Sequence, residues 1–122
     1  MRFEEKRQYR RARYAEPLEC QFPDPSRYGG ALSCDLSAGG LRMKYHDFIP
    51  LGTELTVNVP TESNKVVECQ GKVMWASKMP LTDWYEIGLK FSEDGSGIIT
   101  RKKINEFLES GPLKVKENSE RS

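Results

Sequence analysis

Two short groups of residues in this sequence carry side chains that commonly bind ligands. In the first, near the N-terminus, Arg7 and Arg11 are four residues apart. Three further cations accompany this pair: Lys6, Arg10 and Arg13. The second group combines a carboxylate, a hydroxyl and two glycines: Asp35, Ser37, Gly39 and Gly40. Together the groups offer positive charge, hydrogen-bond acceptors and a backbone that another molecule can approach closely.

These residue types suit a ligand that contains both phosphate and guanine. An arginine guanidinium can bind phosphate through two hydrogen bonds, pair with the O6/N7 edge of guanine, or stack on a base. The carboxylate of Asp35 complements the N1–H and N2–H₂ donors of guanine, and the Ser37 hydroxyl adds an adjustable bond. Glycine at position 40 permits close approach and the positive φ of a tight turn. The pattern predicts a receptor for a guanine nucleotide.

Each group also has an ordinary structural interpretation. A basic segment such as residues 2–13 is often a solvated tail. Asp35 and Ser37 could close a turn at a strand end by accepting hydrogen bonds from backbone N–H groups, and Gly40 could serve that turn alone. Lys6 and Arg10 are expected to be auxiliary phosphate contacts or solvated neighbours.

The distribution of charge limits the kinds of partner. The chain has a net charge of +1, but residues 1–14 carry +4 and the remainder −3. An acidic body argues against binding along a long nucleic acid. No apolar run approaches the roughly 20 residues that a membrane span needs, and no apolar block of a signal peptide follows the basic N-terminus. We therefore expect a cytoplasmic protein of one domain, without a membrane span.

Side chains for catalysis or metal binding are sparse. His46 is the only histidine, which excludes a site with two histidine ligands, and we expect it in a surface turn. No glycine-rich phosphate loop precedes a helix, and the carboxylates are scattered. The three cysteines have no paired metal spacing, so we expect them to be reduced and mostly buried: Cys20, Cys34 and Cys69. We predict a protein that is not an enzyme and has no metal or cofactor.

Alternation of apolar and polar residues predicts six β-strands. They cover residues 18–22, 32–37, 41–45, 54–59, 67–75 and 85–91, and turn residues separate them. Six short strands favour an antiparallel barrel, because closure removes the open edges of the sheet. Residues 96–110 have helical spacing at Ile104, Phe107 and Leu108. The predicted fold is all-β with one C-terminal helix. Its boundaries are a flexible basic arm at 1–14, the barrel with its helix at 15–111, and a disordered tail at 112–122.

The same alternation predicts which side chains face the core. In residues 32–37 it places Leu32, Cys34 and Leu36 inside, and Ser33, Asp35 and Ser37 outside. In residues 67–75 it places Val67, Cys69, Gly71, Val73 and Trp75 on one apolar face. Trp75 is therefore expected mainly in the core.

At the two ligand-type groups the sequence resembles the PilZ family. The family pattern is Arg-x-x-x-Arg in an N-terminal arm, followed by Asp/Asn-x-Ser-x-x-Gly on a barrel strand. The first half matches residues 7–11 and the second matches residues 35–40. The similarity continues through Lys72–Trp75, Tyr85–Phe91 and the terminal helix, and covers roughly residues 5–110.

This resemblance implies a non-catalytic receptor for cyclic di-GMP. Its ligand-binding residues would be Arg7, Arg11, Asp35, Ser37 and Gly40, with auxiliary contacts from Lys6, Arg10, Gly39 and Trp75. In some relatives an aromatic residue at the position of Trp75 resembles a platform for base stacking. The family commonly binds an intercalated dimer of the messenger, and Lys6 and Arg10 are compatible with that. The ordered arm would then change the surface offered to an unknown downstream protein.

Two other functions are compatible with the pattern. A PilZ-like adaptor could act by protein contact alone in pilus or motility control, although it would not need the arginine and Asp/Ser/Gly motifs. A small barrel that binds single-stranded RNA is disfavoured by the acidic body, and by the lack of interleaved basic and aromatic residues on one strand face.

Overall fold

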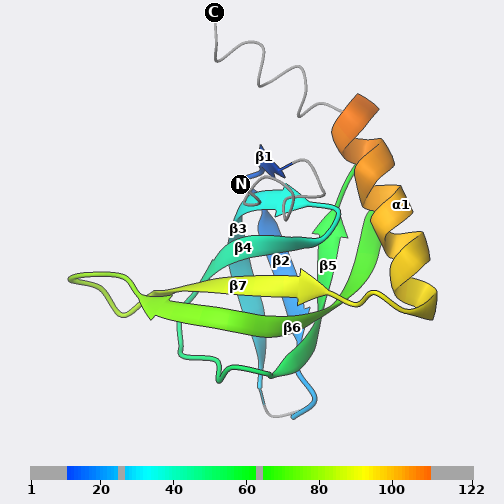
Figure 1. Cartoon of the computed structure of the whole chain (residues 1–122). Helices are drawn as coiled ribbons and strands as arrows, with labels where there is room; N and C mark the ends of the chain where they lie inside the picture. The colour runs from blue at the N-terminus through cyan, green and yellow to red at the C-terminus, as the bar shows by residue number, and fades with distance from the viewer. Residues whose placement is uncertain (1–10, 25–26, 63–64, 111–122) are drawn as a thin grey trace, which may run out of the picture.

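The computed structural model describes residues 11–24, 27–62 and 65–110 (Figure 1). Within these ranges the chain forms seven strands followed by one helix. The elements are β1 (Arg11–Arg13), β2 (Pro17–Gln21), β3 (Tyr28–Ser37), β4 (Gly40–Tyr45), β5 (Glu54–Pro60), β6 (Val66–Lys78), β7 (Tyr85–Phe91) and α1 (Gly95–Ser110).

Six strands close into an antiparallel barrel, which confirms the predicted fold class. The order of pairing around the barrel is β3, β2, β5, β6, β7 and β4. The pairing of β4 with β3 completes the ring, so that each of these strands has a partner on both sides. The short strand β1 is additional. It pairs with the last residues of β3, with Arg11 opposite Ser37 and Arg13 opposite Asp35.

The core lies inside this barrel. Alternate residues of the strands point inward and are almost completely buried, among them Leu36, Met43, Tyr45, Val57, Val59, Ile87 and Phe91. Cys20 and Cys69 belong to the same core, and burial raises the pKa of each thiol to about 12. All three cysteines are unpaired, and Cys34 is only partly buried. The prediction of mostly buried thiols is confirmed for Cys20 and Cys69.

A β-bulge in β3 reverses the predicted faces of its first half. Ser33 is buried and Leu32 is 44% exposed, the opposite of the prediction. The register with β4 shifts between Ser33 and Asp35, so that Cys34 is an extra residue without a partner of its own. After the bulge the prediction holds for Leu36, which is buried, and for Asp35, which lies on the outer side. It is wrong for Ser37, which is buried because its hydroxyl bonds within the β3–β4 hairpin.

A second bulge lies in β6 and changes the position of Trp75. Val73 pairs with Leu89 and Trp75 with Gly88, which leaves Met74 as the extra residue. Val73 is buried, whereas Trp75 is 42% exposed. The prediction that Trp75 lies mainly in the core is therefore wrong, because the inserted residue turns its side chain outward.

Helix α1 packs beside the first part of β6 (Figure 1). The predicted inward residues, Ile104, Phe107 and Leu108, are all buried. The Phe107 ring meets the ring of Tyr14 edge to face, with centroids 6.1 Å apart. Among the described residues, no helix is both long enough and apolar enough to cross a membrane. At the other side of the barrel, the β6–β7 hairpin extends outward (Figure 1).

Candidate ligand-binding site

The last residues of the predicted arm are attached to the barrel. Tyr14 follows β1 directly and is buried, and its N–H donates to the Cys34 carbonyl at 2.9 Å. Its phenol donates to the Pro60 carbonyl, and burial raises the pKa of Tyr14. The buried Ser33 hydroxyl accepts a hydrogen bond from the Glu16 N–H at 3.0 Å. These contacts fix β1 next to the end of β3.

The predicted residues Lys6, Arg7 and Arg10 lie outside the described part of the chain. Their role in binding remains a prediction, as does the flexibility predicted for residues 1–10; the predicted tail at 112–122 also lies outside the described residues. Residues 11–14 are not free of the barrel, because β1 pairs with β3 and Tyr14 is buried.

Asp35 lies between two arginines on the outer side of the barrel. Its Oδ1 is 2.8 Å from Nη1 of Arg11, so the side chains of these two residues are in contact. Its Oδ2 is 2.9 Å from both Nε and Nη2 of Arg42. The hydrogen bond to Asp35 is the main reason that the pKa of Arg42 is raised. The Asp35 side chain is 14% exposed and that of Arg11 is 50% exposed.

Glu86 extends this cluster onto β7. Its Oε2 accepts a hydrogen bond from Nη1 of Arg42 at 2.8 Å. Sequence reasoning missed both Arg42 and Glu86. A signal for Arg42 was present, because a two-residue turn at Ala38–Gly39 sets Asp35 opposite Arg42 in an antiparallel hairpin. No comparable local signal identifies Glu86, which is distant in the chain.

Ser37 and Gly40 are paired on either side of the two-residue turn of the β3–β4 hairpin. The Ser37 hydroxyl accepts a hydrogen bond from the Gly39 N–H at 3.2 Å and donates to the Gly40 carbonyl at 3.3 Å. Gly40 lies against the Leu89 carbonyl so closely that there is no room for a β-carbon. The turn interpretation is therefore correct for Ser37, whereas Gly40 is the first residue of β4 and permits its close approach to β7. A ligand contact at either residue remains a prediction.

Trp75 lies close to the Asp35 cluster on the outer face. Asp35 is opposite Arg42, Arg42 is opposite Gly88, and Gly88 is opposite Trp75 in the sheet register. The indole of Trp75 lies over Gly88 and occupies the space that a β-carbon there would need. A half-exposed aromatic ring thus shares one row across the sheet with the carboxylate and Arg42.

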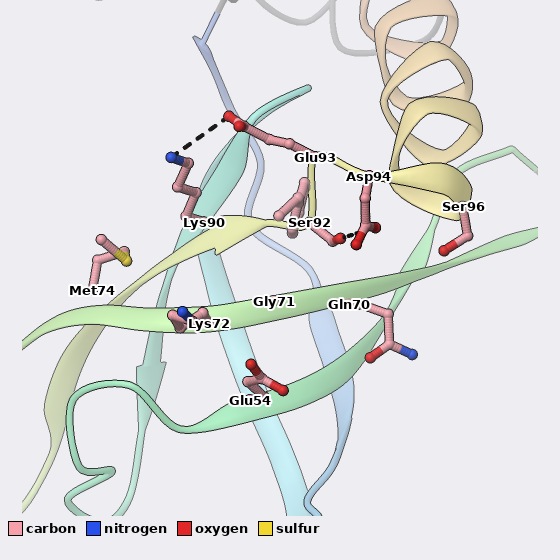
Figure 2. Close-up of a pocket in the computed structure, with 11 residues that line it drawn as sticks. Glu54, Gln70, Gly71, Lys72, Met74, Lys90, Ser92, Glu93, Asp94 and Ser96 are labelled. Carbon is pink, nitrogen blue, oxygen red and sulfur yellow. Dashed lines mark hydrogen bonds and ion pairs between the residues drawn. The ribbon is translucent and has the colours of Figure 1, made fainter.

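A separate pocket of about 500 Å³ lies across β5, β6 and β7, beside the first turn of α1 (Figure 2). Charges of both signs line it, namely Glu54, Lys72, Lys90, Glu93 and Asp94. Lys90 and Glu93 form an ion pair at 3.5 Å, and Ser92 donates a hydrogen bond to Asp94 at 2.7 Å. The pocket contains none of the predicted site residues, and its mixed charges do not favour an anionic ligand.

Solved structures with the same fold include two longer proteins. The inhibitor of motility MotI/DgrA from Bacillus subtilis is 21% identical, with a TM-score of 0.66 over 84% of this chain and 48% of its own. YcgR from Escherichia coli, in complex with c-di-GMP, is 17% identical, with a TM-score of 0.68 over 95% of this chain and 50% of its own. This chain therefore spans about half the length of either structure.

A third structure is matched over almost its full length. The PilZ domain of CeSA, from a cellulose synthesizing bacterium, is 16% identical, with a TM-score of 0.66 over 82% of this chain and 98% of its own. No curated protein matches this sequence. The model of the PilZ domain, however, matches residues 5–110, and this chain therefore belongs to the PilZ domain family.

Proposed function

We propose that this domain is a non-catalytic receptor for cyclic di-GMP, which binds over the β3–β4 hairpin on the outer face of the barrel. The observation that carries the proposal is the placement of Asp35. Its Oδ1 is held by the half-exposed Arg11, and Trp75 lies three strands away in the same row of the sheet, which runs from β3 through β4 and β7 to β6. A guanine acceptor, a movable cation and an aromatic surface are thus close together.

Binding would proceed by exchange of hydrogen-bond partners at Asp35. Without ligand, Arg11 Nη1 donates to Oδ1. The N1–H and N2–H₂ groups of guanine can take its place, because a carboxylate accepts several hydrogen bonds. The released guanidinium can then bind a ligand phosphate or the O6/N7 edge of a base. The exchange costs little, since a partly exposed ion pair contributes only about 0–1 kcal/mol.

The remaining ligand-binding roles follow the same chemistry. Trp75 would stack on a base, which typically contributes about 1–3 kcal/mol. Lys6, Arg7 and Arg10 would neutralise phosphates, and an intercalated ligand dimer with its four phosphate charges would need them most. Ordering of the arm by the ligand would change the surface seen by a downstream protein.

The cellular setting is part of the same proposal. We place the receptor in the cytoplasm, in the control of motility or biofilm formation. The description of MotI as an inhibitor of motility supports motility as the process to examine first.

Calorimetric titration with cyclic di-GMP, cyclic di-AMP and GMP tests the function directly. Adenine presents an N1 acceptor and an N6 donor where guanine presents N1–H and O6. Each mispaired buried group costs about 1–3 kcal/mol, so cyclic di-AMP should bind at least about tenfold more weakly. GMP should also bind far more weakly, since it lacks the second nucleotide. Comparable affinities for the two cyclic dinucleotides would refute the roles of Asp35 and Arg11. Failure to bind any nucleotide would favour the adaptor function.

A further inference from the structure

We propose that Arg42 is a positioning residue that orients the Asp35 carboxylate for guanine, and that Glu86 holds Arg42 in place. This inference rests on the proposed function. It assigns different roles to the two arginines at Asp35, one of which leaves the carboxylate when ligand binds while the other stays.

The hydrogen bonds divide the two oxygens of Asp35 between these arginines. Arg42 directs both Nε and Nη2 to Oδ2 at 2.9 Å, whereas Arg11 directs only Nη1 to Oδ1. The hydrogen bond from Nε, together with the ion-pair contact of Nη2, holds Oδ2 more firmly than the single contact of the half-exposed Arg11 holds Oδ1. Oδ1 is therefore the exchangeable oxygen and Oδ2 the fixed one.

Each of the three guanidinium nitrogens of Arg42 lies against a carboxylate. Its third nitrogen, Nη1, donates to Glu86 at 2.8 Å, so all three nitrogens are engaged by two carboxylates. Its charge is balanced locally, because Arg11, Arg42, Asp35 and Glu86 together carry two positive and two negative charges. This arrangement is unsuited to attracting an anion but well suited to holding a side chain in one orientation.

The strands that carry the two arginines also differ in how firmly they are held in the sheet. Arg42 is on β4, which is paired with β3 on one side and β7 on the other. Arg11 is on β1, the terminal strand in the sheet order, which is joined to β3 by three residue pairs. The fixed arginine thus belongs to the barrel and the exchangeable one to its edge.

Arg42 reaches Glu86 by a diagonal contact across β4 and β7. The residue directly opposite Arg42 is Gly88, and the indole of Trp75 fills the space above it. Glu86 lies two positions away on the same outer face. The guanidinium can therefore contact Asp35 on one neighbouring strand and Glu86 on the other.

The test compares Arg42→Met, Glu86→Gln and the control Lys44→Met by calorimetric titration of the full chain. Lys44 lies two residues along the same strand, and it is not a partner of Asp35 within the described residues. Arg42→Met should lower the affinity of the protein for cyclic di-GMP about tenfold. The ratio of its affinities for cyclic di-GMP and cyclic di-AMP should fall by a similar factor. Glu86→Gln should act in the same direction, by about threefold, and Lys44→Met should change affinity less than about twofold.

Repeating the Arg42→Met substitution in an Asp35→Ala protein shows whether Arg42 positions Asp35 or contacts the ligand directly. If Arg42 acts through Asp35, then Arg42→Met in an Asp35→Ala protein should change the remaining affinity less than about twofold. Arg42→Lys should restore part of the preference for guanine, because it keeps one donor to Asp35 but cannot contact both carboxylates.

Two results would overturn this assignment, and they differ from failure of the proposed function. One is an Arg42→Met protein that loses affinity for both cyclic dinucleotides equally. The other is a loss of affinity on Arg42→Met that is equally large in the wild-type protein and in the Asp35→Ala protein. Either would make Arg42 a structural residue or a direct phosphate contact. A wild-type protein that does not bind cyclic di-GMP would instead reject the proposed function itself, and this inference with it.

Discussion

The indole of Trp75, on β6, lies over Gly88 on β7, and this contact leaves no space for a side chain at position 88. The glycine has two neighbours in the register, since it is also opposite Arg42. Its missing side chain therefore allows an aromatic ring and the Asp35 ion cluster to share one face of the sheet. This relationship gives Trp75 a defined position although it is 42% exposed.

Removing either partner of this contact should weaken ligand binding. Trp75→Ala should lower affinity for cyclic di-GMP about tenfold or more, since stacking of a base on an aromatic ring is worth about 1–3 kcal/mol. Gly88→Ala should cause part of the same loss by displacing the indole. Trp84→Ala is the matched control, because Trp84 is 44% exposed but is not in this row of the sheet. A normal affinity for Trp75→Ala, measured by calorimetry, would remove Trp75 from the site.

Arg11→Ala should separate binding from stability. We expect at least about a tenfold loss of affinity, because in the proposed binding mode the side chain supplies a charge-assisted bond to the ligand. The melting temperature should change little, because a partly exposed ion pair contributes about 0–1 kcal/mol. Calorimetric titration and thermal unfolding of the same preparation measure both effects. A large drop in melting temperature would show that β1 is a structural element first.

Asp35→Ala and Ser37→Ala should differ in how strongly they affect ligand affinity relative to folding stability. Loss of Asp35 leaves guanine donors without an acceptor and should weaken binding strongly. Ser37→Ala should weaken binding less, because water can partly replace a neutral hydroxyl contact. The Ser37 hydroxyl makes two hydrogen bonds within the hairpin, so Ser37→Ala should lower the free energy of unfolding by about 0.5–1.5 kcal/mol. Denaturant unfolding and titration of both variants test the contrast. If Asp35→Ala bound normally and remained folded, the guanine site would lie elsewhere.

Alkylation by iodoacetamide should distinguish the three thiols in the native protein. Cys20 and Cys69 are fully buried, and burial raises the pKa of each to about 12, so neither should react near neutral pH. Cys34 is partly exposed in the bulge of β3. Burial also raises its pKa, so its reaction should be slow and should accelerate as the pH rises and the thiolate forms.

Mass spectrometry of alkylated peptides, with and without cyclic di-GMP, provides the readout. The ligand should slow the reaction at Cys34, which adjoins Asp35. Rapid labelling of Cys20 or Cys69 in the folded protein would contradict the burial of the core.

The sequence was sufficient for the barrel but not for its bulges. Alternation located the strands because inward residues such as Leu55, Val57 and Val59 are buried at every second position. At Cys34 and Met74 an extra residue shifts the phase of that alternation. A bulge depends on pairing with another strand, so a pattern within one strand does not reveal it. The exposed position of Trp75 was missed for this reason.

In the candidate site, too, some residues could be identified from the local sequence, whereas others depend on contacts between distant parts of the chain. Residue type was enough to select Arg11 and Asp35, and the two side chains do meet. Glu86 was not selected, because its role depends on a diagonal contact with Arg42 across two strands that are far apart in the chain. The turn function of Ser37 was among the interpretations that the sequence allowed, and its hydrogen bonds support it.

Among the proposed site residues, Gly40 is the one for which effects on stability and effects on binding should be hardest to separate. A β-carbon at this position would collide with the Leu89 carbonyl, which belongs to the backbone and cannot rotate away. Gly40→Ala should therefore push β4 from β7 and lower the free energy of unfolding by about 1–3 kcal/mol. The movement would also disturb Arg42, two residues further along β4, and through it Asp35.

Affinity of Gly40→Ala should accordingly fall even where the protein is fully folded. Titration well below its melting temperature, after circular dichroism has confirmed the fold, measures that loss alone. Saturating cyclic di-GMP should raise the melting temperature of this variant less than that of the wild type, because ligand stabilisation grows with the ratio of ligand concentration to Kd. A variant with unchanged stability would mean that the hairpin can shift to accept the methyl group, and any loss of affinity would then be due to direct contact between Gly40 and the ligand.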